Sequence, residues 1–196
     1  MGTGRLEAFT DGVVAIIITI MVLELKLPEG RDVPGLLAAA PSFLIYALSF
    51  VNVGLFWNNH HHMLHATRQV NGTVLWANLF LLFWLSLVPF VIRWIGEAGI
   101  SPLPIAAYGL VLTLSGAGYA WLERAIAANP HNRMLARAIG TDWKGWLSLA
   151  GYVVAMLLAF VSAWIAIAIY LAIAIIWLIP DRRIERALGK DADSVG

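Results

Sequence analysis

The sequence FTDGVVAIIITIMVLELKL, residues 9–27, decides the fold of this chain. A helix over these residues would be about 28 Å long, close to the thickness of a bilayer's hydrocarbon core. The stretch contains Asp11, and an ionised carboxylate near mid-membrane costs roughly 2.5 to 3.5 kcal/mol. We therefore predict a membrane-spanning helix in which Asp11 faces protein or water rather than lipid.

The overall composition agrees with a membrane protein. Of the 196 residues, 60% are hydrophobic and 13% are charged, and the mean hydropathy is +0.78. The net charge of +1 provides no dense basic face, so we expect no nucleic-acid partner. The chain has no cysteine, which excludes disulfides, a thiol nucleophile and thiolate metal sites.

Six apolar segments follow one another and predict an all-α integral membrane protein with one domain over residues 1–196. The last two must be short spans joined by a tight turn, and residues 180–196 form a cytoplasmic tail. The predicted helices cover residues 9–27, 38–60, 73–95, 104–124, 145–160 and 163–179. In the linker before the fifth helix, the sequence NRMLARAIG (132–140) predicts a short interfacial helix.

The basic residues of the loops give an orientation. If six segments cross the membrane, ten Lys and Arg residues lie on the side of the termini and three on the other. The positive-inside rule then predicts that the N- and C-termini are both cytoplasmic.

Several residues along the first three predicted helices have a characteristic spacing. They are Arg5, Phe9, Thr10, Asp11, Trp57, His60, Asn78 and Pro89. This spacing resembles the signature of the lysosomal potassium channel called transmembrane protein 175 and its bacterial relatives. Thr10 stands where that family usually has serine, so the hydroxyl group is preserved.

The resemblance implies a potassium-permeable cation channel that prefers potassium over sodium. In such a channel, the first helices of four identical subunits line the pore, and the chain would lie in the bacterial plasma membrane. The expected partners are further copies of the chain, K⁺ and other monovalent cations, and the lipid bilayer. We expect no cofactor besides the permeant K⁺.

The first helix carries an apolar stripe. Ile16, Ile20 and Leu23 share one helical face, and Thr19 is adjacent to it. Such a stripe alone is more typical of packing or lipid contact. The resemblance places Ile16 at the isoleucine constriction of the pore, Thr19 at a pore-facing threonine, and Ile20 and Leu23 in further apolar layers. An apolar ring offers no ligand to a cation, so it would favour potassium, which loses water more cheaply than sodium.

The polar signature residues have two interpretations. In the first interpretation, each polar residue near a helix end simply forms hydrogen bonds with water. Taken together, they predict a buried network in which Asp11 accepts hydrogen bonds from Trp57, His60 and Asn78. This network would set the rotation of the first helix.

Glu24, at the other end of that helix, either attracts cations or pairs with Lys26 or Arg31.

Two other classes of function are open to test. A secondary transporter would use Asp11 and His60 as a proton relay, although the sequence shows no inverted repeat. A metalloenzyme would use His61 and His65, which share a helical face. We expect no metal there because no carboxylate is near in sequence. With no nucleotide-binding loop and no nucleophile beside a base, the chain is not expected to be an enzyme.

Overall fold

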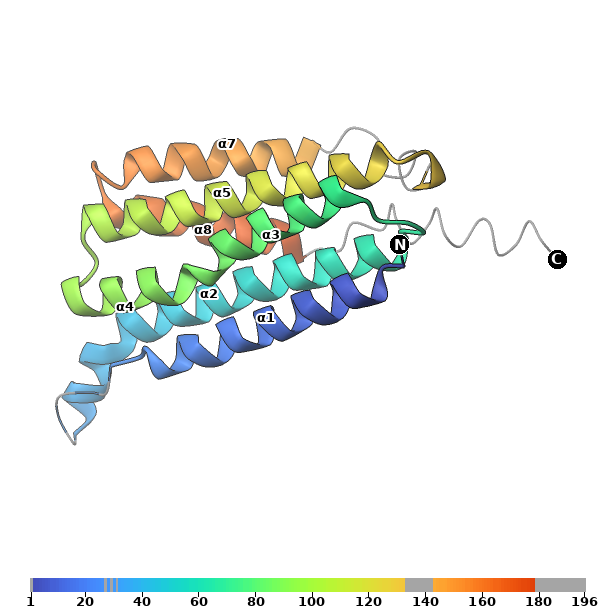
Figure 1. Ribbon diagram of the computed structural model, residues 1–196. Coiled ribbons are helices and arrows are strands. Elements are labelled where there is room, and N and C mark those ends of the chain that lie inside the picture. Colours follow the sequence, from blue (N-terminus) through green and yellow to red (C-terminus); the bar gives the residue numbers. More distant parts are fainter. Residues whose placement is uncertain (1, 27, 29, 31, 133–142, 179–196) are drawn as a thin grey trace.

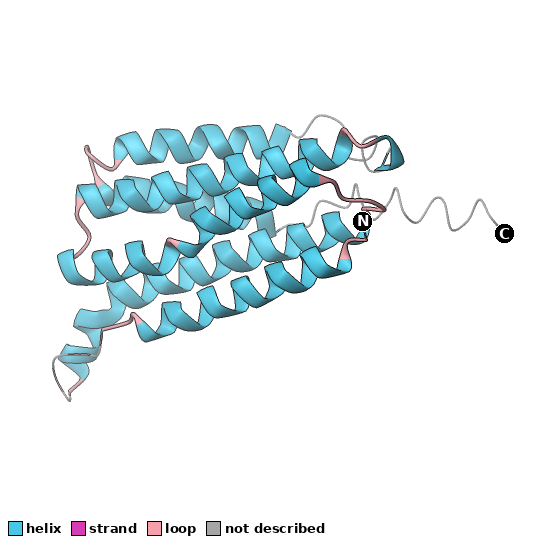
Figure 2. Cartoon of the chain, in the orientation of Figure 1, coloured by secondary structure: helices cyan, strands magenta, loops and turns pink. Residues whose placement is uncertain are grey.

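The computed structural model describes residues 2–26, 28, 30, 32–132 and 143–178, and its regular elements in these ranges are all helices (Figure 2). The α-helices pack lengthwise into one bundle (Figure 1). They are α1 (Gly4–Leu23), α2 (Val33–His65), α3 (Gly72–Ser86), α4 (Val88–Ala98), α5 (Pro102–Ala127), α7 (Trp143–Leu158) and α8 (Ala163–Leu178), and a 3₁₀ turn, η1 (Pro130–Asn132), follows α5.

The first two helices do not begin where the sequence predicted. Helix α1 starts at Gly4 because the carbonyl of Thr3 accepts from the amides of Leu6 and Glu7, and it ends at Leu23 rather than at residue 27. Helix α2 covers residues 33–65 rather than 38–60. Its early start has a local cause, since the Asp32 carboxylate caps the helix by accepting from the Gly35 amide at 3.0 Å.

The predicted third helix, residues 73–95, is broken at Leu87 into α3 and α4. Pro89 explains the break, because proline has no amide hydrogen and its ring clashes with the carbonyl four residues before it. The amide of Leu87 bonds instead to the Trp84 carbonyl at 3.2 Å, which tightens the last turn of α3. At its start, α3 is capped by Asn71, whose side chain accepts from the Val74 amide at 3.0 Å.

In the described part of the chain, four helical stretches are long and apolar enough to cross a membrane. They are α1, α2, the α3–α4 pair over Gly72–Ala98, and α5. Helices α7 and α8 have 16 residues each, about 24 Å of helix, which is shorter than a typical span. They are joined by a turn through Phe160 and Val161, close to the tight turn expected from the sequence. The predicted interfacial helix and the tail at 180–196 lie outside the described residues, apart from Asn132.

Helix α5 occupies the middle of the bundle, while α1 lies at one edge, beside α2 and below α4 in Figure 1. Helices α5 and α3 approach very closely. A Cβ atom added at Gly118 of α5 would come within 3.0 Å of the Leu81 Cα atom of α3. Helices α7 and α8 also approach closely, since a Cβ atom added at Gly151 of α7 would lie 2.9 Å from the Ile173 Cδ1 atom of α8. The edge position of α1 leaves one of its long faces without a partner in the subunit.

Candidate pore helix and its polar network

Helix α1 has two distinct faces. One face is buried against α2, α3 and α4, and its buried residues are Leu6, Thr10, Val14, Ile17 and Met21. The opposite face is open although it is apolar. There Ile16 is 59%, Ile20 39% and Leu23 79% exposed. The residues that the family resemblance assigned to a pore therefore form one continuous exposed stripe.

Thr19 is also exposed and lies within this stripe. Its hydroxyl group donates back to its own helix, with the carbonyl of Ala15 at 3.0 Å and that of Ile16 at 2.9 Å. Since the proton is used by the backbone, the lone pairs of the Thr19 oxygen remain as the outward-facing group. Such an oxygen can interact with a cation or with its hydration water.

One hydrogen bond ties α1 to α2 on the exposed side. The Trp57 indole N–H donates to the Asp11 Oδ1 atom at 2.8 Å. Both residues are exposed in the single subunit. The bond gives the carboxylate of α1 a fixed partner on a neighbouring helix, which resists rotation of α1 about its own axis.

A second, buried chain ties α1 to α3 and α2. The Asn78 Nδ2 atom donates to the Thr10 hydroxyl at 3.0 Å, and the Asn78 Oδ1 atom lies 2.7 Å from His60 Nε2. All three side chains are at most 2% exposed. Because the amide oxygen can only accept, His60 must carry a proton on Nε2. The three polar groups thus satisfy one another inside an apolar bundle.

The geometry of this network differs from the predicted one. We expected Asp11 to accept from Trp57, His60 and Asn78, whereas the structure pairs it with Trp57 and links the other two to Thr10. Successive residues of a helix point about 100° apart. Thr10 therefore faces α3 while Asp11 points toward Trp57 of α2, and no single carboxylate serves both helices.

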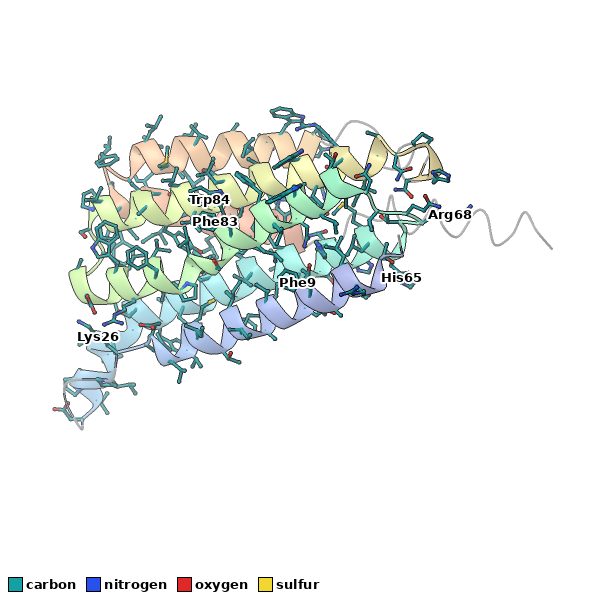
Figure 3. All side chains as sticks on the ribbon, in the orientation of Figure 1. Phe9, Lys26, His65, Arg68, Phe83 and Trp84 are labelled. Carbon is teal, nitrogen blue, oxygen red and sulfur yellow. The ribbon has the colours of Figure 1, made fainter. Side chains whose placement is uncertain are left out.

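Two other signature residues lie outside the network. Arg5 is exposed and forms no hydrogen bond or ion pair with another described residue. Phe9 is 51% exposed on α1 and lies further from the end of the bundle than His65, the last residue of α2 (Figure 3). Their placement gives neither residue a contact that explains its position in the signature.

One interaction was missed by the sequence analysis. The Glu7 carboxylate of α1 lies beside the His61 ring of α2, with 3.0 Å between Oε1 and Nδ1, and the two form an ion pair when His61 is protonated. The His61 ring stacks between those of Trp57 and His65, at centroid distances of 5.9 and 6.0 Å. Glu7 is far away in sequence, so only the pairing of α1 with α2 reveals it. Within the described residues, no group of three potential ligands is arranged to hold a metal ion.

At the opposite end of α1, Glu24 has a partner that the sequence did not predict. Its carboxylate lies 3.6 Å from the Arg93 guanidinium of α4, while Arg31, one of the two expected partners, lies outside the described residues. Arg93 also bonds to Glu97 one helical turn later, at 3.0 Å. The break before α4 turns this helix so that Arg93 reaches the end of α1. Both ends of the candidate pore helix are thus tied to neighbouring helices by polar contacts.

Comparisons with known proteins agree on one family. The family model of the endosomal/lysosomal potassium channel TMEM175 matches residues 5–89. A potassium channel of Chryseobacterium sp. (strain P1-3) is 49% identical over 189 residues, which cover 96% of this chain and 98% of that protein. The crystal structure of a lysosomal potassium-selective channel TMEM175 homolog from Chamaesiphon minutus superposes with a TM-score of 0.80 at 28% identity, over 90% of this chain and 96% of that one.

A more distant similarity extends to animals. The mouse endosomal/lysosomal proton channel TMEM175 is 36% identical over 97 residues, 43% of this chain and 19% of that protein. The similarity to the bacterial channels covers nearly the whole chain, whereas that to the mouse protein covers a part.

Proposed function

This chain belongs to the TMEM175 family of potassium channels, and we propose that it forms a passive, potassium-permeable cation channel whose pore is lined by α1. The permeant ion is K⁺, and ions move down their gradient. Conduction of this kind needs no catalytic group and no cofactor. We propose that it is a multi-pass protein of the bacterial plasma membrane, an assignment that its similarity to bacterial potassium channels supports.

The exposed stripe of α1 is the observation that carries the proposal. Ile16, Ile20 and Leu23 are open in the subunit, while the other face of the same helix is packed against α2, α3 and α4 and hydrogen-bonded to α3. Because α1 is held by these contacts, its exposed face always presents the same side chains. In the proposed channel, this face borders the ion pathway.

Several subunits are needed because one helix cannot enclose a pore. We propose a homotetramer, in which a fourfold axis runs beside the α1 stripe and each subunit contributes an equivalent Ile16. The edge position of α1 in the bundle supports this arrangement, since it leaves the stripe accessible to neighbouring copies (Figure 1).

The proposed constriction selects by the cost of dehydration. A ring of Ile16 side chains offers no oxygen to replace water around an ion, so an ion that sheds water there loses free energy of hydration. Potassium loses less than sodium because it is larger and holds its water more weakly. The Thr19 hydroxyl oxygens, about one helical turn away, would partly replace the lost water. A small narrowing of such a ring would close the pore by dewetting.

The polar contacts of α1 have a positioning role in this proposal. The bond from Trp57 to Asp11 and the chain through Asn78 act on two sides of the helix. Together they determine which residues face the pore. A rotation of 100° about the helix axis would replace Ile16 by the next residue along the chain, Ile17, which is buried here.

Ion flux into liposomes tests the proposal. In Ile16→Asn, we expect the flux to persist and the preference for potassium over sodium to fall, because an amide replaces the apolar ring. The matched control is Ile165→Asn, the same change at an exposed position of α8 away from the stripe. Unchanged flux and preference in Ile16→Asn would remove Ile16 from the constriction.

Reversal potentials separate the channel from a proton-coupled transporter. A channel gives currents that reverse according to the potassium gradient, whereas a transporter couples them to the pH gradient. Among the described residues, Asp11 and His60 have different hydrogen-bond partners, Trp57 and Asn78, so they form no direct relay. We expect the reversal potential to follow potassium, and a potential that followed pH alone would contradict the proposal.

A further inference from the structure

A cavity of about 970 Å³ lies between α2, α5, α7 and the end of α8. It is separate from the exposed stripe of α1. Most of its wall is apolar or aromatic. Members of this wall include Leu55, Phe56, Trp143, Trp146, Leu149 and Trp177. Its volume is at the upper end of the range seen for small-molecule sites.

The cavity wall contains a cation, Arg124, next in sequence to the carboxylate Glu123. The Arg124 guanidinium of α5 lies 5.0 Å from the centre of the Trp146 ring of α7. It forms no ion pair or hydrogen bond with another part of the described chain. Stacking on the indole holds the guanidinium in place while its N–H groups stay available. An occupant of the cavity can therefore place an anionic group here.

Other polar side chains of the wall already have partners, and the Glu123 carboxylate is among them. Ser148 accepts from the Trp177 indole at 2.7 Å and donates to the Lys144 carbonyl at 2.8 Å. Asn52, deeper in the bundle, donates to the Tyr108 hydroxyl at 3.2 Å. These groups therefore need nothing from an occupant. The cavity suits a molecule with an apolar body and an anionic group near Arg124.

The cavity lies at the end of the bundle that we expect to face the cytoplasmic surface of the membrane. It is lined by the last turns of α5 and the first turns of α7, at the end of the bundle where the N-terminus lies (Figure 1). The distribution of basic residues predicts that this end is cytoplasmic. Trp143 and Trp146 are exposed beside the cavity, as interfacial tryptophans are. Basic pockets between membrane helices on this side commonly bind anionic headgroups.

We propose that this cavity binds one anionic phospholipid, with its phosphate on Arg124 and an acyl chain along the wall formed by α2, α5 and α7. In a bilayer, phospholipids are the abundant molecules that combine an anionic group with a long apolar body. The site is independent of the pore, so the proposal does not rest on channel function.

Native mass spectrometry of the assembled protein tests this site. The purified protein is delipidated and then supplied with phosphatidylglycerol or phosphatidylcholine. We expect wild type to retain phosphatidylglycerol in preference. Arg124→Gln should weaken that retention about tenfold or more, because a hydrogen bond to a charged group is lost. The control is Arg68→Gln, which removes an exposed arginine from the same end of the bundle but outside the cavity.

Three outcomes would overturn the proposal. These are equal retention of the two lipids by wild type, equal loss of phosphatidylglycerol in the Arg124 and Arg68 variants, and a bound mass that corresponds to a fatty acid alone. If Arg124→Gln does not fold, the comparison of the two lipids on wild type still tests whether the cavity prefers an anionic phospholipid. Potassium flux is measured in parallel, so that loss of the lipid and failure of the channel are seen separately.

Discussion

At the scale of single residues, the contact between Asp11 and Trp57 is the most exposed part of the polar network and the easiest to break. Asp11→Ala and Trp57→Phe each remove the same hydrogen bond. We expect each to lower the stability of the assembled protein by about 1 kcal/mol, as is usual for such bonds in membranes. We also expect Asp11→Ala to misassemble or to lose conduction, because α1 is then free to rotate.

A double-mutant cycle measures this contact. Thermal unfolding in detergent is recorded for wild type, both single variants and the double variant. If the bond is the shared cause, the double variant is hardly less stable than either single variant. Additive losses of stability, or normal yield, assembly and currents in Asp11→Ala, would show that the contact does not hold α1.

We expect a larger loss of stability from replacing Asn78, because this residue is fully buried. Asn78→Ala leaves both Thr10 and His60 without their partner in an apolar interior. The expected loss is about 1 to 3 kcal/mol of unfolding free energy for each buried polar group left unpaired. Melting temperature is the measurement, and Asn58→Ala on the exposed side of α2 is the control. Equal melting temperatures for the two variants would show that the buried chain contributes little.

At the scale of helices, close contact explains where the bundle tolerates no change. A Cβ atom added at Gly109 of α5 would overlap the Tyr170 hydroxyl of α8 and lie 3.1 Å from the Met156 Cβ atom of α7. Three helices thus converge on one glycine. The Tyr170 hydroxyl is itself held there, since it donates to the Ile105 carbonyl at 3.3 Å.

Gly109→Ala should therefore destabilise the protein. Overpacking of this kind costs about 1 to 3 kcal/mol, because Tyr170 must move and lose its hydrogen bond. Gly116→Ala is a matched control on the same helix, since its new methyl group would lie 3.6 Å from Leu149, an ordinary contact. A melting temperature of Gly109→Ala at or above that of the control would contradict the packing described for α5, α7 and α8.

At the scale of the whole molecule, the absence of native cysteine allows a clean test of assembly. In Ile16→Cys, every subunit carries one thiol. If Ile16 lines a narrow pore around a symmetry axis, thiols of neighbouring subunits come within disulfide range, which requires Cβ atoms about 3.5 to 4.5 Å apart. Mild oxidation should then give covalent dimers on a denaturing gel.

The control for this experiment is Ile165→Cys, an exposed position on α8 that is not part of the stripe. It should give no dimers under the same conditions. The mass of the intact assembly, measured by light scattering, should be four times the 21.4 kDa of one chain. Dimers in the Ile165 variant alone, or a mass of one chain, would rule out a pore formed by four α1 helices.

The sequence by itself determined the class of fold and the family. Apolar stretches too long for a soluble core predicted an all-helical membrane protein, and the spacing from Arg5 to Pro89 identified a family that the comparisons confirmed. These features depend on local composition and on distances along the chain. The helix break at Leu87 was within reach of the same reasoning, because its cause, Pro89, is also local.

The tertiary structure alone decided which polar groups meet. It paired Glu7 with His61 and Glu24 with Arg93, and it linked Asn78 to Thr10 instead of Asp11. The positions of these residues in the sequence carry no information about the rotation of one helix against another. A rotation of 100° exchanges one residue for the next on the contact face. That rotation is set by the packing of whole helices, so the partners of each side chain follow from the fold.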